Sequence, residues 1–578
     1  MQVINIGNEC AGKDAGLSVR AAVESLRSVP GARRLVFAQG VYEFWPDRVA
    51  EEYLFLSNND SGLRRIAFPL RNFSDLEIDG QGSMFLFHGE MVPFSIIESS
   101  GITLKNLSVD FKRPFHNEAQ VVGAGDGYVD LKFNREEFPF AITDGRLLFK
   151  AENGELFGSE NILEFDSGKR ETALMAPRNY DFFLDWNTLA EELPDGVVRL
   201  FARFDEPRPQ VGNILVFGNP HRNCPAIVCD HSSNIAVTDV TIHHAGGMGL
   251  LAQMCNGIRA ERLSVTPSGK RIISTTADAT HFVNCRGDVE LIDCLLENQM
   301  DDPVNVHGIY ARITELVSRF SIEVRLVHHQ QRGIQLFTPG DILEIISPRT
   351  LLTCWSRPVK SVTRLNKEYF VLEFHDRLPE EVEAGYSVGN ESCGTNLTIR
   401  GCTTRGNRAR GFLISAPGRV LVEDNSFHHE GPAILVEGDS NFWFESGAVR
   451  DVCIRRNIFH NCNYGYRGHA VIQISPGVSQ EIEGCVPYHR NIRIEDNHFI
   501  SFSRQLLKAR CVDGLSFVRN HIEWSDAYPS RDQEGVAVVA DNCAGITVSQ
   551  NTGASDWTVV VDGVSVETQT TGTSILAD

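Results

Sequence analysis

The chain has 578 residues, of which 42% are hydrophobic and 22% charged, and its formal net charge is −21. This composition is typical of a folded protein, but the length exceeds what one compact core supports, so several domains or a solenoid are expected. The negative charge repels phosphate backbones, which argues against nucleic acid as a partner. Since no apolar run approaches the ~20 residues that cross a bilayer, we expect no membrane span.

The first residues, MQVINIGNEC, lack the basic and apolar regions of a signal peptide. The chain is therefore expected to be the mature form of a secreted or periplasmic protein, or a cytoplasmic protein if Met1 is its native start. None of the 14 cysteines forms a CxxC pair of the zinc type. Several recur at equivalent places in the repeats described below, so we expect buried free cysteines rather than a disulfide framework.

A short helix is predicted near the N-terminus. Val19, Val23 and Leu26 form an apolar stripe that Pro30 ends, and the strand LVFAQGVYEF follows from Leu35. Such a helix would cover the open end of a stack of coils, which otherwise exposes unpaired strand edges.

One phrase recurs along the chain: an alternating strand, a polar corner and a second apolar strand. It reads SGITLKNLSVDF from Ser100, GRVLVEDNSFHH from Gly418 and HRNIRIEDNHF from His489. The corner positions are assigned to Asp239, Cys294, Cys402, Asn425, Asn457 and Asn497. A β-sandwich also alternates, but it does not explain the recurring corner. The pattern therefore predicts an all-β, right-handed parallel β-helix, with corner asparagines able to form a hydrogen-bonded ladder.

Two segments break the repeat, at about 113–216 and 309–391, and both contain alternating strands separated by turn residues. We interpret them as small antiparallel β-barrels inserted between coils rather than as disordered loops, because they are rich in apolar strands. The predicted units are therefore an N-terminal cap with the first coils (1–112), a first barrel (113–216), central coils (217–308), a second barrel (309–391) and C-terminal coils (392–578).

Three aspartates form the candidate catalytic cluster. Asp278 lies in TTADATHF and Asp301 in ENQMDDPVNVHG, 23 residues later, with Asp302 next to it. Because equivalent positions on adjacent coils stack about 4.8 Å apart, we expect Asp278 and Asp301 one above the other on one face. Crowded carboxylates raise the pKa of at least one of them, which gives the protonated acid and ionised base that glycoside hydrolysis needs.

Polar and aromatic residues near these aspartates suit the recognition of sugar hydroxyls. His281, Asn284, Asn298, Gln299, Asn305 and His307 flank the acids. Farther along, Trp443 offers a flat surface for a sugar ring and Glu445 an acceptor for a hydroxyl. The pairs His243–His244 and His428–His429 are interpreted as stacked polar corner residues rather than ligands. No tight spacing of ligands supports a metal site.

At these motifs the chain resembles glycoside hydrolase family 110, the bacterial α-1,3-galactosidases. The resemblance covers most of the chain, including LVFAQGVYEFWPD, TADATHF, ENQMDDPVNVHG and FWFESG; the first of these is shared with many pectin-lyase-like solenoids. Pro303 departs from the pattern, in which a small residue is expected after the aspartate pair.

The resemblance implies an inverting exo-glycosidase without a cofactor or metal, with Asp301 as general acid and with Asp278 and Asp302 activating water. The implied substrates are oligosaccharides or glycoconjugates ending in α-1,3-linked galactose, of the linear or blood-group-B type. His281, Asn305, His307, Trp443 and Glu445 are the candidate substrate contacts. A homodimer is compatible with the sequence.

Two alternatives come from other classes of protein. A β-helix polysaccharide lyase would use Ca²⁺ and a basic residue against an acidic substrate, and it is disfavoured by the negative charge and by the absence of a Lys/Arg cluster next to the aspartates in the sequence. A non-catalytic glycan-binding solenoid would keep its binding when the aspartates are replaced conservatively.

Overall fold

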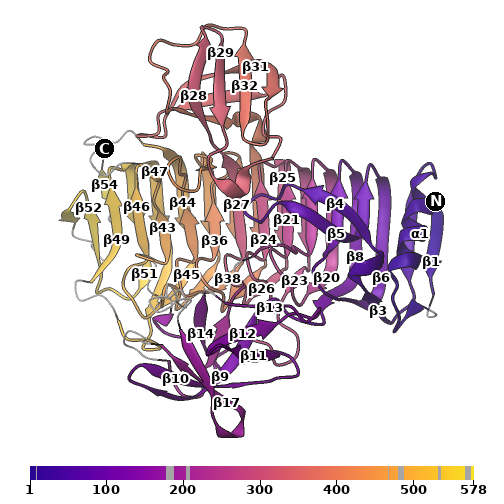
Figure 1. The fold of residues 1–578 in the computed structure, drawn as a ribbon. Helices are drawn as coiled ribbons and strands as arrows, with labels where there is room; N and C mark the ends of the chain where they lie inside the picture. Colours follow the sequence, from indigo (N-terminus) through magenta and orange to yellow (C-terminus); the bar gives the residue numbers. More distant parts are fainter. Residues whose placement is uncertain are drawn as a thin grey trace.

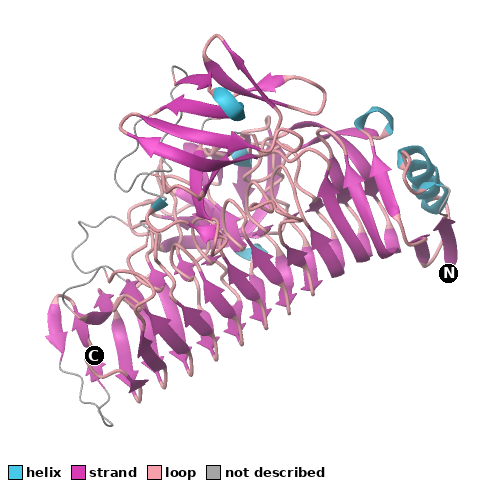
Figure 2. Cartoon of the chain, turned by 90° about the horizontal axis from the view of Figure 1, so that it is seen from below, coloured by secondary structure: helices cyan, strands magenta, loops and turns pink. Residues whose placement is uncertain are grey.

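The computed structural model describes residues 1–7, 10–159, 161–176, 188–202, 209–219, 221–465, 468–478, 487–530, 535–566 and 575–577. The chain forms a long parallel β-helix whose coils stack in sequence from the N-terminal to the C-terminal end (Figures 1 and 2). This confirms the predicted fold class. None of the described helices is long and apolar enough to cross a membrane.

A helix, α1 (Gly16–Arg27), lies at the N-terminal end of the stack. Val19, Val23 and Leu26 are at most 1% exposed and belong to the solenoid core. The predicted apolar stripe therefore closes the first coil, where β1 would otherwise leave the core open.

Most coil strands belong to one long sheet whose neighbours are in parallel register, except that β54 pairs antiparallel with β50. Its strands are β1 (Gln2–Ile6), β2 (Arg33–Phe37), β3 (Val41–Phe44), β6 (Ser74–Phe87), β8 (Ser100–Phe111), β20 (Ser233–Ile242), β22 (Asn256–Glu261), β23 (Ser264–Val265), β25 (Arg286–Ile292), β26 (Leu295–Glu297), β34 (Thr395–Arg400), β35 (Thr403–Arg405), β37 (Arg419–Glu423), β38 (Ser426–His428), β41 (Asp451–Arg455), β42 (Ile458–His460), β44 (His489–Glu495), β45 (His498–Ser501), β47 (Val512–Val518), β48 (His521–Trp524), β50 (Ala544–Ser549), β51 (Thr552–Gly553) and β54 (Ile575–Ala577).

A second sheet covers the other side of the coils and carries the candidate site. Its strands are β4 (Ala50–Leu54), β5 (Gly62–Arg71), β7 (Val92–Ile97), β19 (Ile227–Asp230), β21 (Leu250–Gln253), β24 (Thr280–Val283), β27 (Val304–Ile309), β36 (Phe412–Ile414), β39 (Ile434–Val436), β40 (Glu445–Ser446), β43 (Ile472–Ile474), β46 (Leu507–Arg510), β49 (Val536–Asp541), β52 (Thr558–Val561) and β53 (Val564–Val566).

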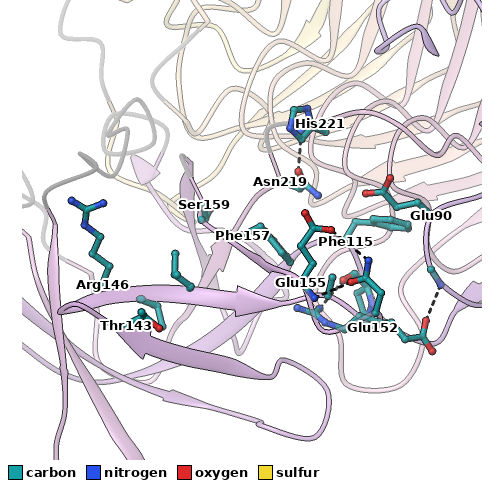
Figure 3. Close-up of a pocket in the computed structure, with 18 of the residues that line it drawn as sticks. Glu90, Phe115, Thr143, Arg146, Glu152, Glu155, Phe157, Ser159, Asn219 and His221 are labelled. Carbon is teal, nitrogen blue, oxygen red and sulfur yellow. Dashed lines mark hydrogen bonds between the residues drawn. The ribbon is translucent and has the colours of Figure 1, made fainter. Parts of the chain in front are cut away.

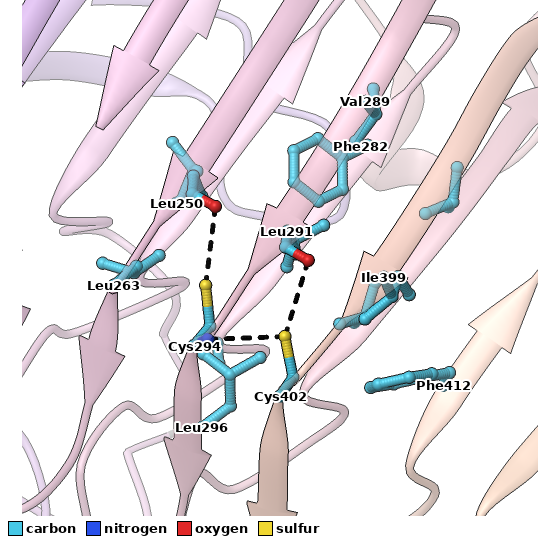
Figure 4. Packing of buried hydrophobic residues seen from close by; sticks show 14 of the residues in the cluster. Leu250, Leu263, Phe282, Val289, Leu291, Cys294, Leu296, Ile399, Cys402 and Phe412 are labelled. Atoms are coloured by element: carbon cyan, nitrogen blue, oxygen red, sulfur yellow. Dashed lines mark hydrogen bonds between the residues drawn. The ribbon is translucent and has the colours of Figure 1, made fainter. Parts of the chain in front are cut away.

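The core between the sheets is built from identical positions on successive coils. Phe427, Phe459 and Phe499 stack along the axis with ring centroids 5.0 and 4.8 Å apart. Cysteines fill the same interior: Cys294 Sγ and Cys402 Sγ are buried and directed at backbone carbonyls (Figure 4). No disulfide joins the cysteines in the described part of the chain, and each of these two acts as a small apolar side chain.

A ladder of asparagines runs along one corner. Each side-chain Nδ2 donates to the Oδ1 of the next coil over 3.0–3.1 Å. The rungs are Asn425, Asn457, Asn497, Asn520 and Asn551. Each rung also donates to a backbone carbonyl, so the buried amides are satisfied within the stack.

The corner assigned to Asp239 is wrong by one residue. Asp239 has φ +54° and a half-exposed side chain paired with Arg262. The ladder position in that coil belongs to Val240, which is buried. Asp424, with φ +58°, holds the same left-handed position before Asn425. The left-handed corner residue and the residue after it thus have different roles, and only the second, inward-facing residue takes the ladder position.

The first insertion folds into antiparallel sheets at one side of the solenoid (Figure 1). Its described strands form an antiparallel seven-stranded sheet and a three-stranded sheet that share one core. They are β9 (Asn117–Gly125), β10 (Tyr128–Phe133), β11 (Phe140–Thr143), β12 (Arg146–Lys150), β13 (Leu156–Phe157), β14 (Ile162–Asp166), β15 (Glu171–Thr172), β16 (Leu189–Glu192), β17 (Val197–Phe201) and β18 (Ile214–Phe217).

The second insertion is a closed six-stranded antiparallel barrel on another side of the central coils. Its strands are β28 (Ala311–Ser318), β29 (Ser321–Arg325), β30 (Ile342–Ile346), β31 (Thr353–Arg364), β32 (Tyr369–Phe374) and β33 (Ser387–Asn390). Its core is continuous with the outer face of the solenoid through Leu251, Val283 and Ile309. The barrel therefore covers the sheet that carries the candidate site.

Candidate active site

The candidate residues lie on the outer face of the second sheet, on β24 and β27. Side chains alternate along these strands: Phe282 and Val306 enter the solenoid core, whereas His281, Asn305 and His307 point outward. These three outward residues are nevertheless at most 4% exposed, because the barrel and surface loops cover this face. Strand alternation thus places a polar row in a buried setting.

Asp278, Asp301 and Asp302 meet at the start of these strands. One carboxylate oxygen of each lies within 4.8 Å of those of the other two. The expected stacking partner of Asp278 was wrong, however. Thr280 pairs with Val304, and the backbone N–H of Ala279 donates to the carbonyl of Asp302, so the register sets Asp278 beside Asp302 rather than Asp301.

Three arginines surround the cluster, which corrects the expectation that no basic group lies beside the aspartates. Arg222 Nη2 donates to Asp301 Oδ2 over 2.8 Å, and Arg408 Nη1 lies 3.5 Å from Asp301 Oδ1. Arg410 holds Asp302 through its backbone N–H (3.0 Å) and its Nη2 (2.8 Å). Three buried carboxylates are therefore balanced by three guanidinium groups.

These charges divide the protons unequally among the carboxyls. Burial raises the pKa of both Asp278 and Asp302, and the charge of Asp301 raises each further. Burial alone would also raise the pKa of Asp301, but Arg408, Arg222 and Arg410 outweigh it and hold that pKa below its ordinary value. In the free protein the negative charge therefore resides first on Asp301.

A chain of hydrogen bonds supports a proton on Asp278. His307 Nδ1 lies 2.7 Å from the carbonyl of Gly308, which can only accept, so Nε2 of neutral His307 is an acceptor. His281 Nε2, 2.9 Å away, must then donate, which leaves its Nδ1 to accept. Asp278 Oδ2, 2.6 Å from that Nδ1, is then the donor. Burial lowers the pKa of both histidines, which favours these neutral forms.

Glu445 joins the same buried network. It lies opposite Ile309 in the short pairing of β40 with β27. Its Oε1 accepts from Asn58 Nδ2 over 2.9 Å and lies 3.6 Å from His307 Nε2. Burial would raise the pKa of Glu445, but the charge of Arg410 and the hydrogen bond from Asn58 lower it. Glu445 is therefore an ionised group at the edge of the cluster.

Trp443 stands in the loop before β40 and is 46% exposed. Its backbone N–H donates to Asp439 Oδ2, and its carbonyl accepts from Gln331 Nε2 of the second insertion over 2.9 Å. Its ring centroid lies 5.0 Å from that of His328. The insertion thus holds an aromatic surface beside the buried carboxyls.

Asn284 and Asn298 have other roles in the described structure. Asn284 Oδ1 accepts from the backbone of Ile309, and Asn298 Nδ2 donates to the carbonyl of Arg170; both residues have positive φ. Gln299 is fully buried two residues before Asp301, and Asn305 stacks on His281.

The two histidine pairs contact structural neighbours. His244 Nε2 accepts from the backbone N–H of Phe115 over 2.9 Å, and His428 Nε2 lies 2.6 Å from Glu171 of the first insertion. His243 Nδ1 lies 3.1 Å from the carbonyl of Thr266, and His429 bonds Thr404 and Asn407. These residues hold coils and insertions together.

Sequence reasoning missed Asn58, Arg222, Arg408 and Arg410, and also Glu437. Burial raises the pKa of Glu437 to about 7, although Arg410 opposes this. Arg410 had one usable signal: it follows β27 by one coil, at the position that stacks on Asp302. Arg222 and Asn58 come from loops whose path over the site has no counterpart in the repeat.

Comparison with known proteins finds matches to both insertions and to the C-terminal coils. The GLAA-B beta-barrel domain I model matches residues 117–215, the GLAA-B beta-barrel domain II model matches 321–388, and a right-handed beta helix region matches 389–572. α-1,3-Galactosidase A of Shewanella woodyi is 38% identical over 526 residues, covering 90% of this chain and 85% of the relative. The chain belongs to the α-1,3-galactosidases of glycoside hydrolase family 110.

Other members of the family show the same extent of similarity. α-1,3-Galactosidase B of Bacteroides thetaiotaomicron is 34% identical, covering 92% of this chain and 87% of its own, and that of Akkermansia muciniphila is 32% identical, covering 93% and 68%. The alignments with these relatives cover 90–93% of the chain and so include the coils with the aspartates, which lie between the matches to the two barrel models. The aspartate cluster is therefore part of the region that the family shares.

Proposed function

We propose that this protein hydrolyses terminal α-1,3-linked galactose from glycans, with inversion of the anomeric carbon. The observation that carries the proposal is the buried cluster of Asp278, Asp301 and Asp302, whose oxygens lie within 4.8 Å of one another inside a chain of the galactosidase family. Carboxyls with pKa values driven apart are what glycoside hydrolysis uses as acid and base.

The proposed roles follow the family pattern, with Asp301 as general acid and with Asp278 and Asp302 activating the attacking water. The free protein favours the opposite distribution, since Asp301 is ionised by its arginines and Asp278 holds a proton. The three carboxyls titrate as one set. We therefore propose that substrate binding transfers a proton to Asp301 over the short distances within this set.

The arrangement supports hydrolysis without a metal. The group formed by the three aspartates could hold a cation by distance alone, but Arg222 and Arg410 donate to two of the carboxylates and already supply positive charge. We expect activity to persist after dialysis against a chelator. Loss of activity that only an added divalent metal restored would contradict this.

The acid role is tested with two substrates that differ in their leaving group. Asp301→Asn should slow hydrolysis of a Galα1-3Gal disaccharide severely, but an aryl α-galactoside much less, because its leaving group needs little protonation. Asp278→Asn and Asp302→Asn should slow both substrates alike. If Asp301→Asn slowed both alike and Asp278→Asn spared the aryl substrate, the two roles would be exchanged.

The same set of variants tests the alternative that the protein is a non-catalytic glycan-binding solenoid. If wild-type protein and all three Asn variants bound the disaccharide equally and none released galactose, the protein would be a binding module. Release of galactose by the wild type, lost in the variants that still bind the disaccharide, supports catalysis by the cluster.

A further inference from the structure

A cavity of about 920 Å³ lies between the first insertion and the solenoid, apart from the carboxyl cluster. Figure 3 shows the mixed character of its wall: Phe115 and Phe157 present aromatic surface, while Glu155, Asn219 and His221 present polar groups. Clefts that bind oligosaccharides combine apolar ring surface with a few directional polar groups in this way.

The cavity is joined to the catalytic cluster by a short series of contacts. His221 lines the cavity, and its Nδ1 lies 3.4 Å from Asp60 Oδ2. The same carboxylate accepts from the backbone N–H of Arg222 over 3.1 Å. The side chain of Arg222 in turn reaches Asp301 Oδ2 at 2.8 Å. Arg222, whose side chain contacts the proposed acid, therefore directly follows a residue of the cavity wall in the chain.

The contacts also show on which side of the cluster the cavity lies. Asp301 is contacted by Arg222, whose chain neighbour His221 lines the cavity, and by Arg408 of the next coil. Asp302 bonds Arg410 and Asp278 bonds His281, so only Asp301 has a partner next to the cavity wall. A general acid protonates the oxygen that leaves with the second sugar. The leaving sugar therefore lies on the side of Asp301, which is the side of Arg222 and the cavity.

We propose that this cavity binds the neutral sugars that follow the terminal galactose, on the leaving-group side of the scissile bond. The proposal rests on the proposed function, because the cavity lies on the leaving-group side of the scissile bond only if Asp301 protonates the leaving oxygen. Phe157 would stack on the apolar face of a sugar ring and Glu155 would accept from a hydroxyl. The first insertion would then act in recognising the remainder of the glycan.

The test compares three substrates: an aryl α-galactoside, a Galα1-3Gal disaccharide, and the trisaccharide in which that disaccharide is extended by N-acetylglucosamine. The variants are Phe157→Ala and Glu155→Gln, which leave the segment containing Arg222 unchanged. Leu156→Ala is the matched control, because Leu156 is an exposed neighbour on β13 that does not line the cavity. All four proteins are compared by kcat/KM and by thermal unfolding.

We expect Phe157→Ala to lower kcat/KM for the trisaccharide by roughly tenfold, the size of a lost aromatic contact, and for the aryl galactoside by less than about twofold. Glu155→Gln should show the same preference with a smaller effect, and Leu156→Ala none. Equal effects on all substrates, or no effect of either variant, would overturn the proposal.

Direct binding separates this proposal from the proposed function. N-Acetyllactosamine, the disaccharide that remains after the terminal α-galactose is removed from the trisaccharide, should give saturation-transfer NMR signals with the wild type that weaken in Phe157→Ala and persist in Leu156→Ala. If the wild type hydrolysed none of the substrates, the proposed function would be wrong. The NMR signal of N-acetyllactosamine would still show whether the cavity binds sugars. Hydrolysis of all three substrates without a Phe157-dependent signal would refute the cavity alone.

Discussion

Arg222 Nη2 lies 2.8 Å from Asp301 Oδ2, so a residue that follows the first insertion determines the charge of an aspartate between the two insertions. The guanidinium favours the ionised form of Asp301 and contributes to its lowered pKa. The contact ties the segment after the first insertion to the aspartate cluster, and it gives the first prediction.

Arg222→Gln should shift the pH dependence of kcat/KM. Removing the positive charge raises the pKa of Asp301 toward its ordinary value. If Asp301 is the acid, which must be protonated, the alkaline limb of the profile moves to higher pH. Movement of the acidic limb instead would make Asp301 the base. Arg357→Gln, at an exposed arginine of the second insertion paired with Asp376, is the control and should leave both limbs in place.

Asp278→Asn should abolish activity and at the same time make the protein relatively more stable at higher pH. The pKa of Asp278 is raised on folding, so the stability it contributes is fully present below its unfolded pKa near 3.9 and is lost as pH rises through the folded value. The amide cannot ionise and avoids that loss. The variant should be inactive, and its Tm should gain on the wild type as pH increases from 5 to 9.

Asp301→Asn should change Tm at neutral pH in the opposite direction from Asp278→Asn. The pKa of Asp301 is lowered on folding, so this group stabilises the protein above its unfolded pKa. Its replacement should lower Tm at neutral pH by leaving Arg222 and Arg408 without their carboxylate. A Tm of Asp278→Asn that fell relative to the wild type with rising pH would contradict the proton assigned to Asp278.

Asn457→Ala should weaken the solenoid. Asn457 Oδ1 accepts from the backbone and side chain of Asn425, and its Nδ2 donates to Val422 and Asn497. Losing these partners leaves several buried polar groups unpaired, at a cost on the order of 3 kcal/mol in the free energy of unfolding. Asn396→Ala, at an exposed asparagine, is the control for denaturant unfolding. Equal effects of the two would mean that the ladder adds no stability.

Trp443→Ala should raise KM several-fold without lowering Tm, because the ring is half-exposed beside the cluster. Glu445→Ala should lower both substrate affinity and Tm, since Glu445 is buried against Asn58 and His307. Phe442→Ala is the control for the loop, at a side chain that is 72% exposed. Unchanged KM and kcat in the first two variants would assign this loop a structural role only.

The coil architecture was predictable because each coil repeats the same physical requirement. Inward positions such as Phe459 and Phe499 must be apolar and must stack, so the same alternation of apolar residues recurs in each coil of the sequence. The error at Asp239 shows the limit of this reasoning. A left-handed turn residue and the inward residue after it can both be polar, and a single sequence does not distinguish the two positions until the register is known.

The aspartates could be found for the same reason, but their partners could not. Counting from Asp278 to Asp301 gave a one-coil spacing, whereas the strand register pairs Asp278 with Asp302 because Thr280 pairs with Val304. Arg222 comes from a loop and approaches the cluster only through the three-dimensional fold.

The stereochemistry of the product tests the central claim most directly. The carboxyl groups of inverting glycosidases are typically separated by roughly 6.5–9.5 Å and those of retaining enzymes by roughly 5–5.5 Å. In the free protein one oxygen of each aspartate lies within 4.8 Å of the others, a spacing nearer the retaining value, so the configuration of the first product decides between the two mechanisms. Proton NMR should follow the disaccharide Galα1-3Gal during the first minutes of hydrolysis by the wild-type enzyme. We predict that β-galactose appears first and that α-galactose follows only by mutarotation; α-galactose as the first product, or no released galactose, would contradict the account.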